Sequence, residues 1–532
     1  MKTGIIKRYF SYLAKAFPVL CASGDIPYLP AAAKAHDLLD RLEDFSPRTI
    51  DRHVAKITSF LKDFEKIADS NIGIGNEQGK AMATNARGVL LEFSGAESWR
   101  KDPSLYLKTA FTGIHHALTL PAKSEKARVK RTMKRLRAVP GFLGQTEENI
   151  VMVTPETKAV SQTMIRDCAR YLQELGQSGQ LKSDPKSAQS LQDCLDTLRE
   201  VDRHIHTRSV VDEAEGPDME TVLTEGLGTS KTVREIFEAA NAEWHGALDC
   251  LQHIASDMGE PDWRNIYEEY TGPGREDAST LTLFKQEVER LRTFFGETAF
   301  GGQLPDLPLS LGESPSYMAS LRRAAHYCAP LSKTEGDSAR LLVIPHAFSG
   351  RGFREDPVRL QRARKELTFL AAQETIPGSH LMASRRLLSD DPIISQLRNP
   401  LVAGGWRAFG EHLLLETGYL ETPAEQLMFQ RRRLCRAARC VVDTGLCIGH
   451  ADQDRSMELM DQSGFSKKES LEQLRAIRLT PGSHVAPVLG NMEIKALREM
   501  AELDITVFCK AFLDGGETPF SMTHLKLKAG QH

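Results

Sequence analysis

Apolar residues recur at every third or fourth position along most of this chain. The clearest stretch begins after Ser46 and Pro47, and its apolar positions are Ile50, Val54, Ile57, Phe60, Phe64 and Ile67. Such spacing places one apolar stripe on a helix, and a serine followed by a first-turn proline is typical of a helix start. Similar stretches are 161–175, 190–204, 230–258, 281–295, 359–374, 405–417 and 426–442. Strict alternation of apolar and polar residues is almost absent, and 341–344 is the clearest short strand candidate.

This pattern predicts an all-α protein, an elongated helical body with a central cleft and at most a small β-hairpin. Residues 207–219 are polar and acidic and contain a Gly-Pro pair, which is typical of a linker. We therefore expect an N-terminal helical half over 1–206, a linker over 207–219, and a C-terminal helical half over 220–532.

Composition narrows the class of protein. The chain has 532 residues, 68 Lys and Arg against 71 Asp and Glu, and 41% hydrophobic residues, which excludes disorder and a disulfide-stapled miniprotein. A formal net charge of −3 argues against a nucleic-acid partner. No run approaches the ~18 apolar residues of a membrane span, so no membrane partner is expected. Nine scattered cysteines without a CxxC pair favour a reducing, cytoplasmic location. The sequence does not predict the oligomeric state.

Two polar features have structural interpretations. Residues 123–137 carry eight basic residues against the single Glu125, and we interpret them as the solvated face of an amphipathic helix rather than a nucleic-acid patch. The adjacent His115 and His116 cannot both face one site on a helix, so we expect them to be structural.

The segment LTFLAAQETIPGSHL, residues 367–381, carries the most unusual chemistry. Glu374 falls on the apolar face of the predicted helix, where a carboxylate is costly unless it is paired, hydrogen-bonded or protonated. Pro377 and Gly378 must break or kink the helix, which would let His380 fold back towards Glu374. A buried glutamate and a histidine at a helix break can form an acid/base or metal site. The alternative is a glutamate capped by backbone amides, with His380 filling the turn.

This segment resembles the HExxPGHH motif of the metallopeptidase-like bacterial family called "domain of unknown function 885". Further segments resemble the family in the same order along the chain: Asp44–Pro47, Trp99–Tyr106, Tyr327–Pro330, Gly404–Glu411 (EGWALYAE), Arg436–Cys447 (RAxRLVVDTGLH) and Pro481–Gly490 (PGQALSYKIG). The resemblance is collinear over nearly the whole chain. It implies a helical body with a metal-dependent amide-hydrolase site.

In the family pattern a histidine pair and a downstream glutamate hold zinc, and the glutamate of the His-Glu dipeptide activates water. The resemblance makes Glu374 the base and His380 its partner or a metal ligand. Gln373 and Ser379 replace two motif histidines, and Gly404 replaces the downstream glutamate. Cys447, Ser483 and Pro487 replace further motif residues. Because an amide oxygen is a far weaker zinc ligand than an imidazole, these replacements argue against an ordinary zinc site.

Several of the remaining candidates have more than one interpretation. Tyr327, Arg436, Arg439, Asp443 and His484 are the candidate substrate-binding residues. The two arginines could bind a substrate carboxylate, or belong to a structural ion-pair network. His484, beside a Pro-Gly turn, could replace a lost ligand, act as a general base, or be an ordinary loop histidine.

Glu411 is a second candidate metal ligand beside His380. Arg407 precedes it by four residues, so an ordinary helical ion pair is the alternative.

Three functions therefore stay open for a peptide or small amino-acid-derived substrate. The first is a divergent metallohydrolase-like enzyme with altered chemistry at the former zinc site, in which Glu374 is the base. The second is a catalytically inactive binding protein of the same fold. The third is an active zinc peptidase that recruits ligands such as His484 or Glu411.

Overall fold

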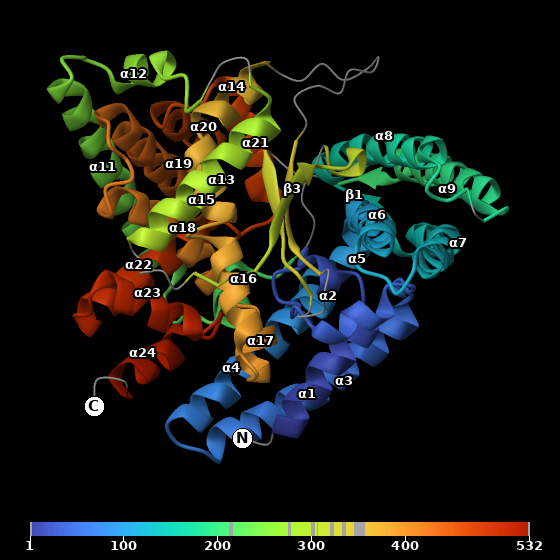
Figure 1. The fold of residues 1–532 in the computed structure, drawn as a ribbon. Coiled ribbons are helices and arrows are strands. Elements are labelled where there is room, and N and C mark those ends of the chain that lie inside the picture. The colour runs from blue at the N-terminus through green and yellow to red at the C-terminus, as the bar shows by residue number, and fades with distance from the viewer. Residues whose placement is uncertain are drawn as a thin grey trace.

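The computed structural model of this protein describes residues 3–182, 184–211, 216–274, 278–298, 300, 304–305, 307–319, 324–331, 337–344 and 357–529. Helices account for 72% of the structure and the sheets are small, which confirms the all-α prediction. Figure 1 shows the N-terminal helices on one side and most C-terminal helices on the other, with a three-stranded sheet between them. No helix of the described ranges is long and apolar enough to cross a membrane. The central cleft and the division at 207–219 stay predictions.

The N-terminal part is a set of packed helices. Its elements are α1 (Thr3–Ala16), α2 (Leu20–Ser23), the 3-10 helix η1 (Ala33–Leu38), α3 (Pro47–Asp69), α4 (Ile74–Leu90), the π-helix η2 (Leu91–Ala96), α5 (Ser98–Lys101), α6 (Pro103–Thr119), α7 (Glu125–Asn149), α8 (Pro155–Ser178) and α9 (Ser187–Thr207). α3 begins at Pro47, as predicted. Its apolar stripe is buried, with Ile50, Ile57 and Phe64 at most 1% exposed. Removing this stripe from water is the main driving force for docking the helix.

The basic stretch 123–137 is helical, but two of its arginines do not face solvent. Arg131 donates to the carbonyl oxygens of Ala117 and Pro121, each at 2.6 Å, at the C-terminal end of α6. Arg135 is fully buried, and its guanidinium donates to the carbonyl oxygens of Arg41 and Gly113. Cations at a helix C-terminus satisfy carbonyls that have no partner within the helix. Part of this basic excess therefore caps α6, which corrects the expectation of a purely solvated face.

Two small sheets interrupt the helices. β1 (Met152–Val153) pairs in parallel with β2 (Ser209–Val210). β3 (Leu309–Glu313), β5 (Ala339–Val343) and β4 (Ala325–Cys328) form the larger sheet in the order β3-β5-β4, with β3 parallel and β4 antiparallel to β5. The predicted strand at 341–344 falls in β5, and the sheet has one strand more than a hairpin. The short 3-10 helix η4 (Ser316–Met318) lies between β3 and β4 along the chain.

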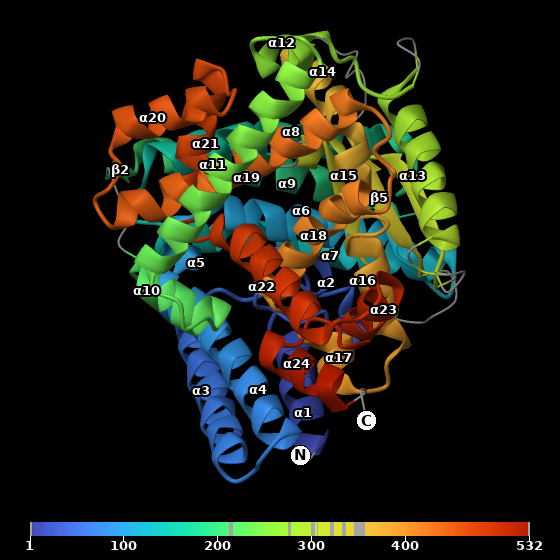
Figure 2. The ribbon, with the colours of Figure 1, turned by 90° about the vertical axis from the view of Figure 1, so that its left-hand side faces the viewer.

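The C-terminal part contains the helices that carry the motif segments. Its elements are α10 (Met219–Thr221), the π-helix η3 (Val222–Leu227), α11 (Val233–Asp257), α12 (Trp263–Glu269), α13 (Thr280–Glu297), α14 (Pro357–Lys365), α15 (Leu367–Glu374), α16 (Ser379–Leu388), α17 (Pro392–Gln396), α18 (Pro400–Glu416), α19 (Pro423–Cys447), α20 (Gln453–Gln462), α21 (Lys467–Leu479), α22 (Val485–Ala501), α23 (Ile505–Asp514) and α24 (Phe520–Ala529). α11 packs along α19, and α18 packs along α22 (Figure 2).

The contact between α18 and α22 depends on glycines. A Cβ at Gly405 would lie 2.4 Å from the carbonyl carbon of Gly490, and one at Gly490 would lie 2.1 Å from the carbonyl oxygen of Leu401. Real Cβ atoms do not approach backbone atoms this closely, so only glycine permits this separation of the two helices. This contact fixes where the motif segments of α18 and α22 lie relative to each other.

Candidate functional site

The predicted helix break lies between α15 and α16. α15 ends at Glu374, α16 begins at Ser379, and the Ile376–Pro377 peptide bond is cis. The fully buried Trp406 of α18 donates its indole N–H to the carbonyl oxygen of Pro377 at 2.8 Å. A Cβ at Gly378 would lie 2.1 Å from the Gln373 carbonyl oxygen, so this position of the turn requires glycine. Pro377 and Gly378 therefore form the break, and Trp406 of α18 holds it in place.

Glu374 lies at the end of α15, next to β4. Its Oε2 accepts the backbone N–H of Tyr327 at 3.2 Å, and its Oε1 lies 3.9 Å from Nη1 of Arg407. The Glu374 side chain is 17% exposed and the Arg407 side chain is 45% exposed. The backbone of β4 thus holds Glu374, and its side chain remains partly exposed to solvent. The sequence offered Arg407 as a partner of Glu411, so this neighbour of Glu374 was missed.

His380 is more deeply enclosed. It is 5% exposed, and its Nδ1 lies 3.2 Å from the Tyr327 hydroxyl and 3.5 Å from Oγ of Ser384. Burial lowers the pKa of His380 to about 4 and raises the pKa of Tyr327 well above its usual range. Both groups are therefore neutral near pH 7, and a hydrogen bond joins the Tyr327 hydroxyl to Nδ1 of His380.

Tyr327 stands between the two motif residues. Its backbone holds Glu374 and its hydroxyl holds His380. The contacts of the described residues do not include the direct pairing of Glu374 with His380 that the helix break led us to expect. The physical reason is that β4 inserts Tyr327 beside the break. The sequence pattern could not show this, since β4 has no alternating apolar signal.

Glu411 belongs to a buried ion cluster. It is fully buried, accepts from Nε of Arg432 at 2.8 Å, and accepts a second hydrogen bond from Arg436. Arg432 also donates to Glu366 at 2.5 Å. Burial alone would raise the pKa of Glu366, but Arg362 and its neighbouring arginines hold that pKa well below its usual range. Glu411 therefore pairs with α19 and not with Arg407, and a metal would have to displace two arginines from it.

The remaining α19 candidates contact other groups. Arg439 donates to Oε1 of Gln473 at 2.7 Å. Asp443 accepts the backbone N–H groups of Gly482 and His484, at 3.0 and 3.2 Å, and so holds the turn before α22. Nδ1 of His484 lies 3.6 Å from the same carboxylate. Arg436 also lines a small hollow with Glu243 and others.

The donor set around the break does not fit zinc. Gln373 and Ser379 bring neutral oxygens, and the Ser379 hydroxyl donates to the Gln373 carbonyl oxygen at 3.0 Å. A Cβ at Gly404 would already lie 3.2 Å from backbone atoms of Ala486 and Pro487, so this position packs against α22. Within the described ranges, no three His, Cys, Asp or Glu side chains form a group that could hold a metal ion. Structural and catalytic zinc sites ordinarily use at least three such ligands.

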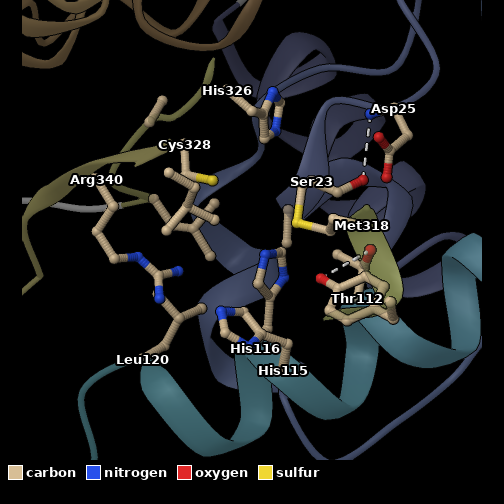
Figure 3. Close-up of a pocket in the computed structure, with 15 residues that line it drawn as sticks. Ser23, Asp25, Thr112, His115, His116, Leu120, Met318, His326, Cys328 and Arg340 are labelled. Atoms are coloured by element: carbon tan, nitrogen blue, oxygen red, sulfur yellow. Dashed lines mark hydrogen bonds between the residues drawn. The ribbon is translucent and has the colours of Figure 1, made fainter. Parts of the chain in front are cut away.

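One pair of residues was misjudged from the sequence. His115 and His116 of α6 both line one small hollow, together with residues of β4 and β5 (Figure 3). Consecutive helical side chains point about 100° apart, yet both reach this space because η4 and the sheet surround α6 on that side. The spacing of the two histidines along the helix could not predict that both would line the same hollow.

Comparisons with known proteins give the family and the fold. The model of the family described as "Bacterial protein of unknown function (DUF885)" matches residues 30–526. The structure is similar to that of a "putative lipoprotein of unknown function" from Shewanella oneidensis, with 15% identity, 100% of each chain covered and a TM-score of 0.71. It is also similar to a "putative lipoprotein" from Colwellia psychrerythraea, with 14% identity, 99% of each chain covered and a TM-score of 0.70. No curated protein matches the chain. Since the family match extends over nearly the whole sequence, the chain belongs to the bacterial family DUF885, whose function is unknown.

Proposed function

We propose that this chain is a divergent, hydrolase-like member of its family that acts on a peptide or small amino-acid-derived substrate by acid–base chemistry without zinc. In this proposal Glu374 is the catalytic base and Arg407 binds a substrate carboxylate. His380 is a positioning residue that acts through Tyr327.

The observation that carries the proposal is the difference in exposure among the carboxylates of the motif segments. The Glu374 side chain is 17% exposed, whereas those of Glu411 and Asp443 are 0% and 1% exposed. A general base must come within hydrogen-bond reach of the proton that it removes. Of these three carboxylates, Glu374 is the one a substrate or a water molecule can approach without first disrupting the fold.

The surroundings of Glu374 support the same chemistry. The Arg407 guanidinium presents a planar set of N–H donors that suits a carboxylate, and its side chain is 45% exposed. His380 is too enclosed to touch a substrate. Its neutral ring is instead hydrogen-bonded to the Tyr327 hydroxyl and so fixes the strand whose backbone N–H holds Glu374.

A second candidate is a binding protein that does not turn its ligand over. This candidate is favoured because two other motif carboxylates, those of Glu411 and Asp443, already form hydrogen bonds within the protein. Such a protein would keep Arg407 for recognition but would lack groups to complete a reaction.

The experiment compares the wild-type protein with Glu374→Gln on a panel of dipeptides and N-acyl amino acids. We expect kcat to fall by about 10²- to 10⁴-fold, the usual contribution of general acid–base catalysis, with a much smaller change in KM. The exposed Glu472→Gln is the matched control and should retain full activity.

Two outcomes would contradict the proposal. Equal turnover by Glu374→Gln would remove its catalytic role, and tight binding without turnover by the wild-type protein would favour the binding protein. Zinc bound at one ion per chain, and lost in a His380→Ala variant, would instead support the active zinc peptidase.

A cytoplasmic location is part of the same proposal. Tyr9 and Leu13 of α1 are fully buried in the core, and Cys21 is 1% exposed. Helix α1 and Cys21 therefore belong to the folded body. The descriptions of the two similar structures as lipoproteins support an envelope location as the alternative. Fractionation of cells that express the chain with a C-terminal tag should recover it with cytoplasmic markers, and recovery in the membrane fraction would overturn this location.

A further inference from the structure

The turn before α22 brings together a serine, a histidine and an aspartate. Oγ of Ser483 lies 3.0 Å from Nδ1 of the adjacent His484. The same nitrogen lies 3.6 Å from Oδ2 of Asp443 on α19. A hydroxyl within hydrogen-bond reach of an imidazole, with a third group beside that imidazole, is the arrangement of an activated nucleophile. Ser483 and His484 both depart from the PGQALSYKIG pattern of the family, so the family resemblance gives this pair no role.

The backbone of this turn holds the serine and the histidine in place. Gly482 has a φ of 81°, a conformation that glycine adopts readily. Its N–H and that of His484 both donate to the Asp443 carboxylate, at 3.0 and 3.2 Å. The N–H of Ser483 donates to the carbonyl oxygen of Thr480 at 3.1 Å. The turn is therefore fixed on both sides of Ser483, and its side chain keeps a defined position beside the imidazole.

Two neighbouring atoms lie within reach of the Ser483 hydroxyl proton. Oγ1 of Thr480 lies 3.0 Å from Oγ of Ser483, and the Thr480 hydroxyl donates to the carbonyl oxygen of Ala476 at 3.1 Å. Because that contact uses the single proton of Thr480, its oxygen can only accept from Ser483 and helps to orient the hydroxyl. In the tautomer with its hydrogen on Nε2, His484 offers Nδ1 as an acceptor. An imidazole nitrogen is a much stronger base than a hydroxyl oxygen, so Nδ1 is the atom that removes the proton.

The exposure of the three side chains suits different roles. Ser483 is exposed, the His484 side chain is 19% exposed and the Asp443 side chain is 1% exposed. A substrate can therefore reach the hydroxyl, whereas the carboxylate stays within the protein. Once Nδ1 has taken the serine proton, the imidazolium lies 3.6 Å from this carboxylate. An opposite charge this close favours the charged ring.

We propose that Ser483 and His484 form a nucleophilic site that cleaves small esters, with Asp443 as the positioning residue. Oγ of Ser483 attacks the ester carbonyl carbon, and its proton passes to Nδ1 of His484. The bond from that carbon to the alcohol oxygen breaks, and the alcohol leaves with the proton from Nδ1. Water then hydrolyses the acyl-serine by the same route, which releases a carboxylic acid and restores the hydroxyl. Because Ser483 is exposed, little protein surface surrounds the acyl group, and short acyl chains fit best.

Labelling of the full-length protein with diisopropyl fluorophosphate tests this assignment. An activated hydroxyl displaces fluoride from the reagent and keeps the phosphoryl group, so mass spectrometry should find the adduct on Ser483. His484→Gln should slow this labelling by about 10²-fold or more, the usual contribution of a general base. The exposed Ser70, whose hydroxyl donates to the carbonyl oxygen of Lys66 at 2.6 Å, is the matched control and should stay unlabelled.

Two further measurements separate turnover and the role of the carboxylate. Release of p-nitrophenol from p-nitrophenyl acetate should be slower in Ser483→Ala than in the wild-type protein, whereas Ser70→Ala should match the wild-type rate. Asp443→Asn should slow the labelling of Ser483 by about tenfold, since it removes the charge beside the imidazole. Asp443→Glu restores that charge and should recover part of the loss, which a purely structural role would not predict.

Four results would overturn the assignment. These are the absence of an adduct on Ser483, equal labelling of Ser70 and Ser483, an unchanged labelling rate in His484→Gln, or an unchanged esterase rate in Ser483→Ala. Both substituted side chains reach the surface, so these variants should keep the wild-type circular dichroism spectrum. The adduct is located at a single residue, so failure of this site is distinct from failure of the activity proposed for Glu374.

Discussion

Two glutamates of the motif helices, Glu411 on α18 and Glu374 at the end of α15, have opposite surroundings. Glu411 is fully buried and accepts from two arginines of α19, whereas Glu374 is partly exposed and lies 3.9 Å from its arginine. The first arrangement holds two long helices together, and the second leaves a carboxylate within reach of solvent. Resemblance to a motif therefore does not tell whether a carboxylate serves the fold or the chemistry. The number and closeness of the charged groups around a carboxylate are more informative.

The largest expected effect comes from removing the buried charge. Glu411→Gln leaves Arg432 and Arg436 without their shared carboxylate, and breaking such a buried pair costs about 3–5 kcal/mol of unfolding free energy. Glu374→Gln, which loosens one partly exposed pair, should cost at most about 1 kcal/mol. Urea denaturation of both variants measures the difference. Equal losses would show that the two glutamates are held alike.

A third carboxylate, that of the buried Glu43, sharpens the comparison because no guanidinium of the described residues forms a hydrogen bond with it. Its Oε1 accepts the backbone N–H groups of Val19 and Leu20, and burial raises its pKa to about 7. Since the folded pKa lies above the ordinary value of 4.5, the unfolded chain ionises first as the pH rises. Stability should therefore fall between about pH 4.5 and pH 7, by up to about 3 kcal/mol, and then level off.

The Glu43→Gln variant keeps an acceptor for Val19 and Leu20 but cannot ionise. The difference in unfolding free energy between this variant and the wild-type protein should grow over that pH range. A constant difference from pH 4 to pH 8 would mean that Glu43 titrates as an exposed carboxyl does.

The smallest of these effects concerns the position of the missing motif glutamate. Gly404→Glu adds a side chain whose first atom would lie 3.2 Å from the backbone of α22, and overpacking of this kind costs about 1–3 kcal/mol. Combined with Gln373→His, it should lower the melting temperature without creating zinc binding, as followed by calorimetry and metal analysis. Stoichiometric zinc in the double variant would show that α22 yields and that these two replacements removed the metal.

Local features of the fold could be predicted from the sequence, whereas contacts between side chains that are distant in the sequence could not. The start of α3 at Pro47 and the break at Pro377 follow from the backbone chemistry of proline and from the spacing of apolar residues. Tyr327 entered the prediction through a family resemblance, but its position between Glu374 and His380 depends on a strand that has no sequence signature. The choice of Arg432 and Arg436 over Arg407 by Glu411 depends on how α18 crosses α19. Spacing along one helix carries no information about that crossing.

The close approach of α18 and α22 also limits which side chains the neighbouring position can carry. Once Gly405 and Gly490 allow two backbones to touch, the neighbouring Gly404 lies beside a wall of main-chain atoms that no rotamer can avoid. A larger side chain at position 404 therefore requires the backbone of α22 to move by a few tenths of an ångström, so the packing of these two helices controls what this position can carry.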